Sequence, residues 1–376
     1  MSLALPNIFL GLVLLVFLFK KNKILGQNGY TKLAFIFVSY FFIKATYFNS
    51  FTENFSIYKH LFVFLVFSFL IFNIKNLLLS LKGYVLGVFL AVVISFINIL
   101  IFYFSFKTLP FGNSSEVQNL IIIHRPYFGF MCLISIILID FLTPKIKNKK
   151  EKIVYVLIAF FTIIFLFIIV ARLSLFLLIF YITVRIFFYF KFSRIKSIII
   201  LTLILASLTS FFMLNKNLKE RLHIKNSYEK TIAVLKNQEP RFVIWDCFVK
   251  QISNSEFNIF FGYKNRKSIQ ENLNKCYNNS IDNVSKRNYY LATQFNTHNQ
   301  FFDVFLGGGV IGFILIFTIF IFSAYIFRGD FNLLFIIVSF FLFFTVENLL
   351  NRQLGAYLFG IFTPLFFKIF ESKNEI

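Results

Sequence analysis

The stretch Tyr84-Val-Leu-Gly-Val-Phe-Leu-Ala-Val-Val-Ile-Ser-Phe-Ile-Asn-Ile-Leu-Ile-Phe-Tyr-Phe-Ser-Phe106 contains no charged side chain. A continuous apolar run of about 18 residues or more is typical of a helix that spans a membrane. A strand of a transmembrane β-barrel would instead show about ten residues of alternating polarity. This stretch therefore predicts an α-helical membrane protein.

The composition extends this prediction to the whole chain of 376 residues. Hydrophobic residues make up 58%, charged residues only 14%, and there are 61 phenylalanines. At about 20 residues per span, that apolar content is enough for roughly eleven helices. It excludes a soluble enzyme, a nucleic-acid-binding domain, a disordered chain and a secreted disulfide scaffold. The predicted fold is an all-α polytopic membrane protein with about 11 (10–12) transmembrane helices. Its apolar runs are 3–19, 33–48, 57–73, 84–106, 120–141, 153–170, 173–190, 197–214, 301–327, 331–347 and 354–370.

The net charge of +22 predicts the topology rather than a nucleic-acid partner. Lys and Arg accumulate in cytoplasmic loops of membrane proteins, and here they gather in alternate connections. The other short loops hold little beyond Lys59 and Lys107, so we expect the N-terminus outside and the C-terminus inside. The basic connections hold Lys20, Lys21, Lys23 and Lys32; Lys75 and Lys82; Lys145, Lys147, Lys149, Lys150 and Lys152; Lys191, Arg194 and Lys196; Arg328; and Lys373.

A polar segment over residues 215–300 divides the chain into three predicted regions. Residues 1–214 form an N-terminal membrane region with about eight helices, and residues 301–376 form a C-terminal one with about three. We expect residues 215–300 to be a large, partly helical periplasmic loop, since long loops translocate regardless of charge. Within it, Pro240 predicts a helix start, and the apolar residues that follow favour a helix on the membrane surface.

The usual motifs of nucleotide and metal chemistry are missing from the sequence. It has no phosphate-binding glycine loop, no dinucleotide fingerprint, no serine nucleophile elbow, no zinc motif and no Asp-x-Asp pair. We therefore expect no metal and no cofactor. Cys132 is read as a small core residue, whereas Cys247 and Cys276 both face the oxidising side. Sequence gives no geometry, so whether these two pair stays open.

The remaining chemistry is cationic and lies at the outer face. His298, directly before an apolar run, is a candidate general base, because an unperturbed imidazole titrates near pH 6.5; the alternative is an interfacial residue that caps a helix. Arg172 and Arg241 are candidate phosphate ligands, because a guanidinium matches phosphate oxygens; the alternatives are a snorkelling turn residue and a surface helix residue. His124 and Arg125 are further substrate-binding candidates, or interface anchors. Clustered cations beside a base favour an anionic lipid-linked substrate such as a pyrophosphate.

At these residues the sequence resembles the O-antigen ligase and O-antigen polymerase superfamily of bacterial glycosyltransferases. The resemblance covers about residues 160–365, and over the first 150 residues it is only topological. It rests on Ala171-Arg172, Arg241-x-x-x-Trp245, Phe260-Phe-Gly262, His298-Asn299, Phe305-Leu-Gly-Gly-Gly309-Val-Ile-Gly312 and Glu347-Asn-Leu-Leu-Asn-Arg352-Gln-Leu-Gly355. Two features depart from the family: Gly262-Tyr-Lys264 replaces a Gly-x-Gly, and the count is eleven spans where ligases commonly have twelve.

The resemblance implies a metal-independent transfer of a glycan from undecaprenyl pyrophosphate to a sugar hydroxyl. By this analogy His298 deprotonates the acceptor, while Arg172 and Arg241 hold the pyrophosphate. The sequence is interpreted as an inner-membrane ligase that acts on lipid A–core at the periplasmic face, with membrane lipids and no nucleic acid as partners. The first alternative is a repeat-unit polymerase of the same superfamily. The second is a polysaccharide flippase or transporter, for which Lys44, Arg185 and Glu347 are the nearest intramembrane charges.

Overall fold

The computed structural model describes residues 4–19, 28–107, 114–189, 202 and 239–374. These residues are mostly helical, and the one extended pairing among them is an isolated bridge between Asn258 and Gly262. The helices are α1 (Ala4–Phe19), α2 (Gly29–Tyr47), α3 (Phe51–Leu70), α4 (Leu77–Phe106), α5 (Ser114–Leu120), α6 (Arg125–Leu142), α7 (Lys149–Ile169), α8 (Arg172–Tyr189), α12 (Pro240–Ile252), α13 (Arg266–Ser280), α14 (Val284–Thr293), α15 (Gln300–Phe327), α16 (Phe331–Phe344) and α17 (Gln353–Asn374). The all-α class predicted from the sequence is thus confirmed for the described part of the chain.

Six of the described helical stretches are long and apolar enough to cross a membrane. They lie on α3, α4, α6, α7, α15 and α17, and α16 is a shorter apolar helix. Helices α1, α2 and α8 fall on three more predicted runs without joining the six. The predicted run 197–214 lies outside the described residues. A multi-pass helical membrane protein is therefore supported, and the count of about eleven spans stays a prediction.

The chain separates into two compact units. The first covers Asn76–Thr231, and the second combines Ser2–Lys75 with Ile232–Ile376. The second unit thus brings the first helices of the chain together with the polar segment and the last three apolar helices. The three predicted regions describe position relative to a membrane, which this division into units does not test.

The first unit is built around α6. This helix starts with Pro126 in its first turn, where a missing N–H costs nothing, and its side chains are buried along nearly its whole length. Helices α4, α7 and α8 pack around it. Gly129 allows the closest approach, since an added Cβ there would lie 2.3 Å from the Cβ of Ala171. Near the other end of α6, Asp140 accepts a hydrogen bond from Tyr181 and pairs with Arg185 at 2.9 Å.

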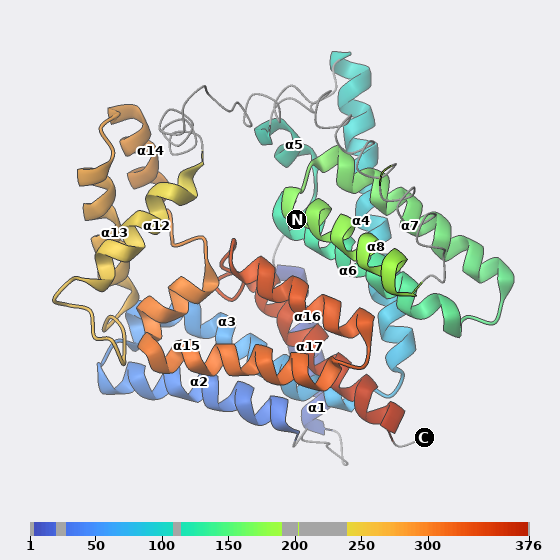
Figure 1. The fold of residues 1–376 in the computed structure, drawn as a ribbon, viewed down its shortest axis with the longest axis horizontal. Helices are drawn as coiled ribbons and strands as arrows, with labels where there is room; N and C mark the ends of the chain where they lie inside the picture. The colour runs from blue at the N-terminus through green and yellow to red at the C-terminus, as the bar shows by residue number, and fades with distance from the viewer. Residues whose placement is uncertain (1–3, 20–27, 108–113, 190–201, 203–238, 375–376) are drawn as a thin grey trace. The chain divides into compact units, whose positions relative to one another are not determined.

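The membrane part of the second unit packs α2, α3, α15 and α17 side by side (Figure 1). Aromatic rings fill the space between them: Phe64 of α3 stacks on Phe359 of α17, with the two ring centroids 5.5 Å apart. Such contacts replace the hydrophobic driving force that helices lack in lipid, because packing itself then holds helices together. Many phenylalanines of the sequence pack between these helices.

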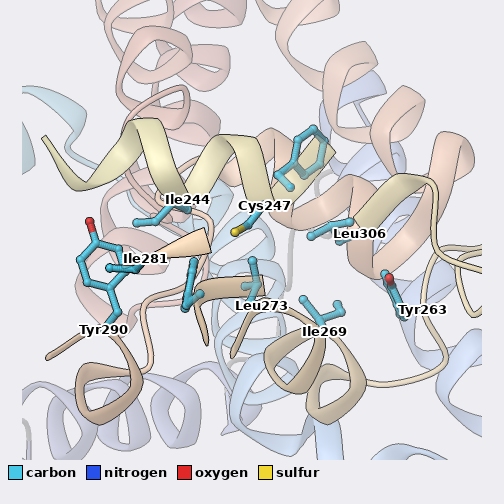
Figure 2. Close-up of a cluster of buried hydrophobic side chains, with 10 residues drawn as sticks. Ile244, Cys247, Tyr263, Ile269, Leu273, Ile281, Tyr290 and Leu306 are labelled. Atoms are coloured by element: carbon cyan, nitrogen blue, oxygen red, sulfur yellow. The ribbon is translucent and has the colours of Figure 1, made fainter. Parts of the chain in front are cut away.

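Helices α12, α13 and α14 form a small domain with its own core, which we call the polar domain (residues 239–295). Its buried side chains come from all three helices (Figure 2). Cys247 of α12 and Cys276 of α13 form a disulfide, which settles the pairing that the sequence left open. The predicted helix start at Pro240 is confirmed, and Arg241 lies in the first turn of α12. The buried core and the disulfide together fix where this turn sits.

Candidate functional site

Helix α15 is two helical arms joined by a sharp bend at Gly309. The backbone there has φ 60° and ψ −162°, a conformation that suits glycine alone. Phe301 of the first arm packs against Phe317 and Phe320 of the second, with ring centroids 6.5 and 5.8 Å apart. In a straight helix, Phe301 and Phe317 would be about 24 Å apart along the axis. The first arm therefore folds back along the second (Figure 1).

The bend leaves backbone groups without helical partners, and the loop Asn258–Tyr263 supplies them. Val310 N–H donates to Ile259 O at 2.9 Å, and Ile311 N–H donates to Phe260 O at 3.4 Å. In return Tyr263 N–H donates to Leu306 O at 2.8 Å. Irregular backbone inside a membrane bundle is tolerated only when its polar groups are paired in this way.

Two side chains of α2 donate hydrogen bonds to carbonyls at the bend. Lys44 Nζ donates to Tyr263 O at 2.6 Å and also to Gly307 O. Tyr40 Oη donates to Gly308 O at 2.6 Å. Lys44 is 7% exposed, so its charge is held by these carbonyl dipoles rather than by water. The sequence alone showed Lys44 as an intramembrane charge. It could not show its partners, because they lie more than 200 residues further along the chain.

His298 stands immediately before the first arm of α15. Asn299 caps that arm by accepting a hydrogen bond from Phe302 N–H, so His298 itself is not the cap. The backbone of His298 has φ 44°, a left-handed conformation that is uncommon for a non-glycine residue. Its N–H donates to Asn296 Oδ1 at 3.1 Å, and its ring lies 5.5 Å from that of Phe295. The imidazole is thus set by a tight local turn, a form of strain that often accompanies functional sites.

Glu347 lies between the two predicted site residues of this unit. It is in the connection between α16 and α17, with only 11% of its side chain exposed. Its Oε2 is 3.8 Å from His298 Nδ1, and its Oε1 is 3.4 Å from Arg241 Nη2. Burial by itself raises the pKa of Glu347, but His298, Arg241 and Arg352 together outweigh it and lower that pKa below its usual value. Glu347 is therefore a carboxylate at neutral pH.

Arg241 reaches this carboxylate from the start of α12. Its Nη1 is 2.7 Å from Glu239 Oε1, and its Nη2 also donates to Val346 O at 3.3 Å. The buried Nε has no hydrogen-bond partner. The guanidinium thus carries a buried donor, Nε, without a partner, and it lies between two carboxylates with a third of its side chain exposed. An arriving phosphate would meet a cation whose position is already fixed.

A second layer of polar side chains holds the first. Trp245 Nε1 donates to Thr297 O at 3.2 Å, which ties α12 to the residue before His298. Asn348, the neighbour of Glu347, donates to Thr297 Oγ1 at 3.2 Å and to Asp303 Oδ1 at 3.3 Å. Asp303 is 4% exposed and pairs with Arg266 at 2.5 Å. Polar groups buried at this depth are hydrogen-bonded to one another, as expected for a site kept rigid.

The other predicted site residues, Arg172, His124 and Arg125, belong to the first unit. Arg172 is the first residue of α8, and Arg125 is the first residue of α6, with His124 just before it. The two helix starts are neighbours, because the first turns of α6 and α8 touch at Gly129 and Ser174. These three residues are therefore brought to one end of their own unit. Their meeting with Arg241 and His298 stays a prediction, because the two units are described separately.

The sequence alone did not predict that Glu347 links His298 to Arg241, nor that Asp303 forms a buried ion pair with Arg266. Both acids carried a signal: Asp303 lies inside an otherwise apolar run, and Glu347 lies at the end of one. An ionisable residue in such a place marks a functional or structural site by default. No group of three or more metal-ligating His, Cys, Asp or Glu side chains occurs in the described residues.

A comparison with known protein families indicates what kind of chemistry these residues serve. Residues 157–317 match the O-antigen ligase family. This match supports placing the chain in the superfamily of O-antigen ligases and polymerases, as the resemblance predicted. It includes Arg172, Arg241 and His298, and it ends before Glu347. No curated protein matches the chain. An O-antigen ligase or polymerase type of function is thus supported, without distinction between the two.

Proposed function

We propose that the chain is an O-antigen ligase-type glycosyltransferase, which moves a glycan from undecaprenyl pyrophosphate to a sugar hydroxyl of lipid A–core. The observation that carries the proposal is the contact of Glu347 with both His298 and Arg241. Of these three residues, His298 and Arg241 lie inside the segment that matches the family. A base, a carboxylate that orients it and a phosphate-binding cation are the groups that such a transfer requires.

In the proposed reaction, the Nε2 atom of His298 accepts the proton of the acceptor hydroxyl. The freed oxygen forms a bond to the anomeric carbon of the donor sugar. The bond between that carbon and the pyrophosphate oxygen breaks, and its electron pair leaves with the lipid pyrophosphate. Arg241 neutralises this leaving group, and Arg172 is proposed as a further pyrophosphate ligand.

Glu347 has a positioning role in this scheme. Its carboxylate faces the Nδ1 atom of His298, so it favours the tautomer that carries a proton on Nδ1. The free lone pair then lies on Nε2, where a base is needed. The same carboxylate holds Arg241 near the imidazole, so that both groups face one substrate.

We place the site on the periplasmic side of the bacterial inner membrane. Two observations support this side: basic residues gather in the opposite loops, and the polar domain contains a disulfide. His124 and Arg125 are proposed as further donor contacts. No metal and no cofactor take part, because the donor already carries an activated leaving group.

A strain that lacks the gene distinguishes the candidates when it is examined for surface polysaccharide. Free polymer on the lipid carrier with uncapped core means a ligase, and core capped with single repeats means a polymerase. Repeat units trapped on the cytoplasmic leaflet would mean a transporter and would overturn the proposal.

Purified protein with lipid-linked donor should keep its activity in excess chelator. A loss of activity that magnesium or manganese restores would contradict the metal-independent mechanism.

A further inference from the structure

The loop Asn258–Tyr263 exposes three apolar side chains in a row. Ile259 is 46% exposed, Phe260 59% and Phe261 43%. The sequence placed these residues in a polar external segment, where a run of exposed aromatic side chains is not expected. Single exposed apolar residues are common on soluble surfaces, but contiguous ones mark a surface that contacts something apolar.

Most backbone groups of this loop are hydrogen-bonded within the loop, to α15 or to Lys44 of α2. Four consecutive N–H groups, from Phe260 to Tyr263, donate to protein acceptors, and the side chain of Asn258 accepts two of them. The carbonyls of Asn258, Ile259, Phe260 and Tyr263 all accept from protein donors. A loop in water has no need of such extensive pairing. A loop in contact with lipid requires it, because no solvent is available to satisfy the chain.

The loop is held against the end of a predicted membrane span. Its partners Leu306, Val310 and Ile311 flank the bend of α15, which is one of the six candidate spans. Directly after the loop, Arg266 N–H donates to Asn54 Oδ1 in the first turn of α3. Aromatic side chains are also exposed where α2 ends and α3 begins: Tyr47 at 81%, Phe51 at 43% and Phe55 at 57%. Aromatic residues gather in this way at membrane–water interfaces.

We propose that the loop Asn258–Tyr263 inserts into the membrane interface and that Ile259, Phe260 and Phe261 contact phospholipid acyl chains. The exposed polar residues Glu256 and Lys264 on either side mark where the chain returns to water. Gly262 fits this role, since its φ of 72° and a Cβ position 2.3 Å from Leu306 O exclude other residues. The loop thereby fixes the depth of the α15 bend, and this inference does not depend on the transfer reaction.

Tryptophan fluorescence tests the proposal, because Trp245 is the single tryptophan of the chain. In a Trp245→Phe background, Phe260→Trp is compared with Asn278→Trp. Asn278 is exposed on α13, whose open face carries the ion pair of Lys267 and Glu271 and therefore faces water. Both proteins are placed in vesicles of phosphatidylethanolamine and phosphatidylglycerol, without any glycan donor, with ordinary or brominated acyl chains.

Brominated lipid should lower the fluorescence intensity of the tryptophan at 260 by about two-fold, as expected for a ring at a depth of about 5–10 Å. The tryptophan at 278 should keep its emission and be quenched by aqueous iodide instead. Iodide quenching at 260 without a bromine effect would overturn the proposal. If the Trp245→Phe background does not insert, cysteines at 260 and 278 are compared in a Cys132→Ser protein. An impermeant maleimide should label only residue 278, and equal labelling would overturn the proposal.

Discussion

Helix α6 is continuous from Arg125 to Leu142, whereas α15 is broken at Gly309. Both lie among other apolar helices of their units, and each depends on a glycine. Gly129 of α6 has no side chain because Ala171, the residue directly before α8, occupies that space. Gly309 of α15 has no side chain because the backbone reverses there and meets Phe260 O, 2.2 Å from the Cβ position.

This difference explains where polar side chains collect. A continuous helix satisfies its own backbone, so the surroundings of α6 consist of apolar side chains along most of its length. A broken helix leaves N–H and C=O groups that need partners, and around α15 they come from Lys44, Tyr40 and the loop Asn258–Tyr263. The bend also turns the start of α15 back into its unit, which brings His298 to Glu347. In this protein the candidate site is therefore a consequence of the break.

The largest expected effect is on transfer by His298→Gln, compared with His124→Gln at the start of α6. The first variant removes the proposed base, so kcat should fall by roughly 10²–10⁴-fold while donor binding is kept. The second removes only a proposed donor contact, so it should raise KM and leave kcat nearly unchanged. Steady-state transfer assays with lipid-linked donor check both. A His298→Gln enzyme with near-normal kcat would mean that the base lies elsewhere.

Gly309→Ala tests the bend. Gly307→Ala, in the same stretch of three glycines, is its control. Alanine at 309 combines a strained positive φ, worth about 1–2 kcal/mol, with a backbone clash. We expect little folded protein and no transfer. At 307 an added Cβ meets its nearest atom at 3.9 Å, an ordinary contact, so that variant should fold. Fluorescence-detected size-exclusion chromatography measures both. Equal yields of monodisperse protein would show that α15 does not need the bend.

Glu347→Gln tests the positioning carboxylate. Glutamine keeps the size of the side chain but not the charge that orients the imidazole and holds Arg241. Transfer should fall by about 10–100-fold, as is usual for a group that orients a reacting one. A Glu347→Asp variant, which keeps the charge, should retain more transfer than Glu347→Gln. Equal losses in the two variants would indicate a purely structural role.

Lys44→Met should lower stability without touching the reacting groups, and Lys59→Met on the exposed side of α3 is its control. Methionine leaves the carbonyls of Tyr263 and Gly307 without their donor, at a cost of about 1–3 kcal/mol. The midpoint of thermal unfolding in detergent should therefore fall clearly for Lys44→Met and stay unchanged for Lys59→Met. Equal midpoints would show that water or other donors serve these carbonyls.

The smallest expected effect is a pH dependence of stability that Glu347 contributes. Its pKa in the folded protein is lowered, so the folded state favours the carboxylate. This contribution is fully present above the ordinary carboxyl pKa of the unfolded chain, about 4.3, and is lost as the pH falls through the lowered folded value. The stability difference between the native protein and Glu347→Gln should thus shrink as the pH drops below about 4. A difference that is constant from pH 7 to pH 3 would contradict the lowered pKa.

The sequence by itself determined the fold class, most of the apolar helices and a resemblance to the O-antigen ligase family that the family match supports. Length and uniform apolarity suffice for that, because a helix satisfies its own backbone wherever it lies in a membrane. It also pointed to His298 and Arg241 as candidates, by residue type and by their place beside apolar residues. It could not show that Glu347 joins them, because this contact links three segments of the chain.

Only the tertiary structure decided the course of α15 and the partners of its bend. Residues 300–327 form a largely apolar pattern interrupted mainly by Gln300, Asp303 and four glycines, and that pattern fits a straight span equally well. The choice between straight and folded depends on whether other segments can take up the freed backbone groups. Those segments, Tyr40, Lys44 and the loop Asn258–Tyr263, lie from about 50 to more than 260 residues away along the chain. Local pattern describes what a stretch of backbone can do alone, and hydrogen bonds between distant segments decide what it does.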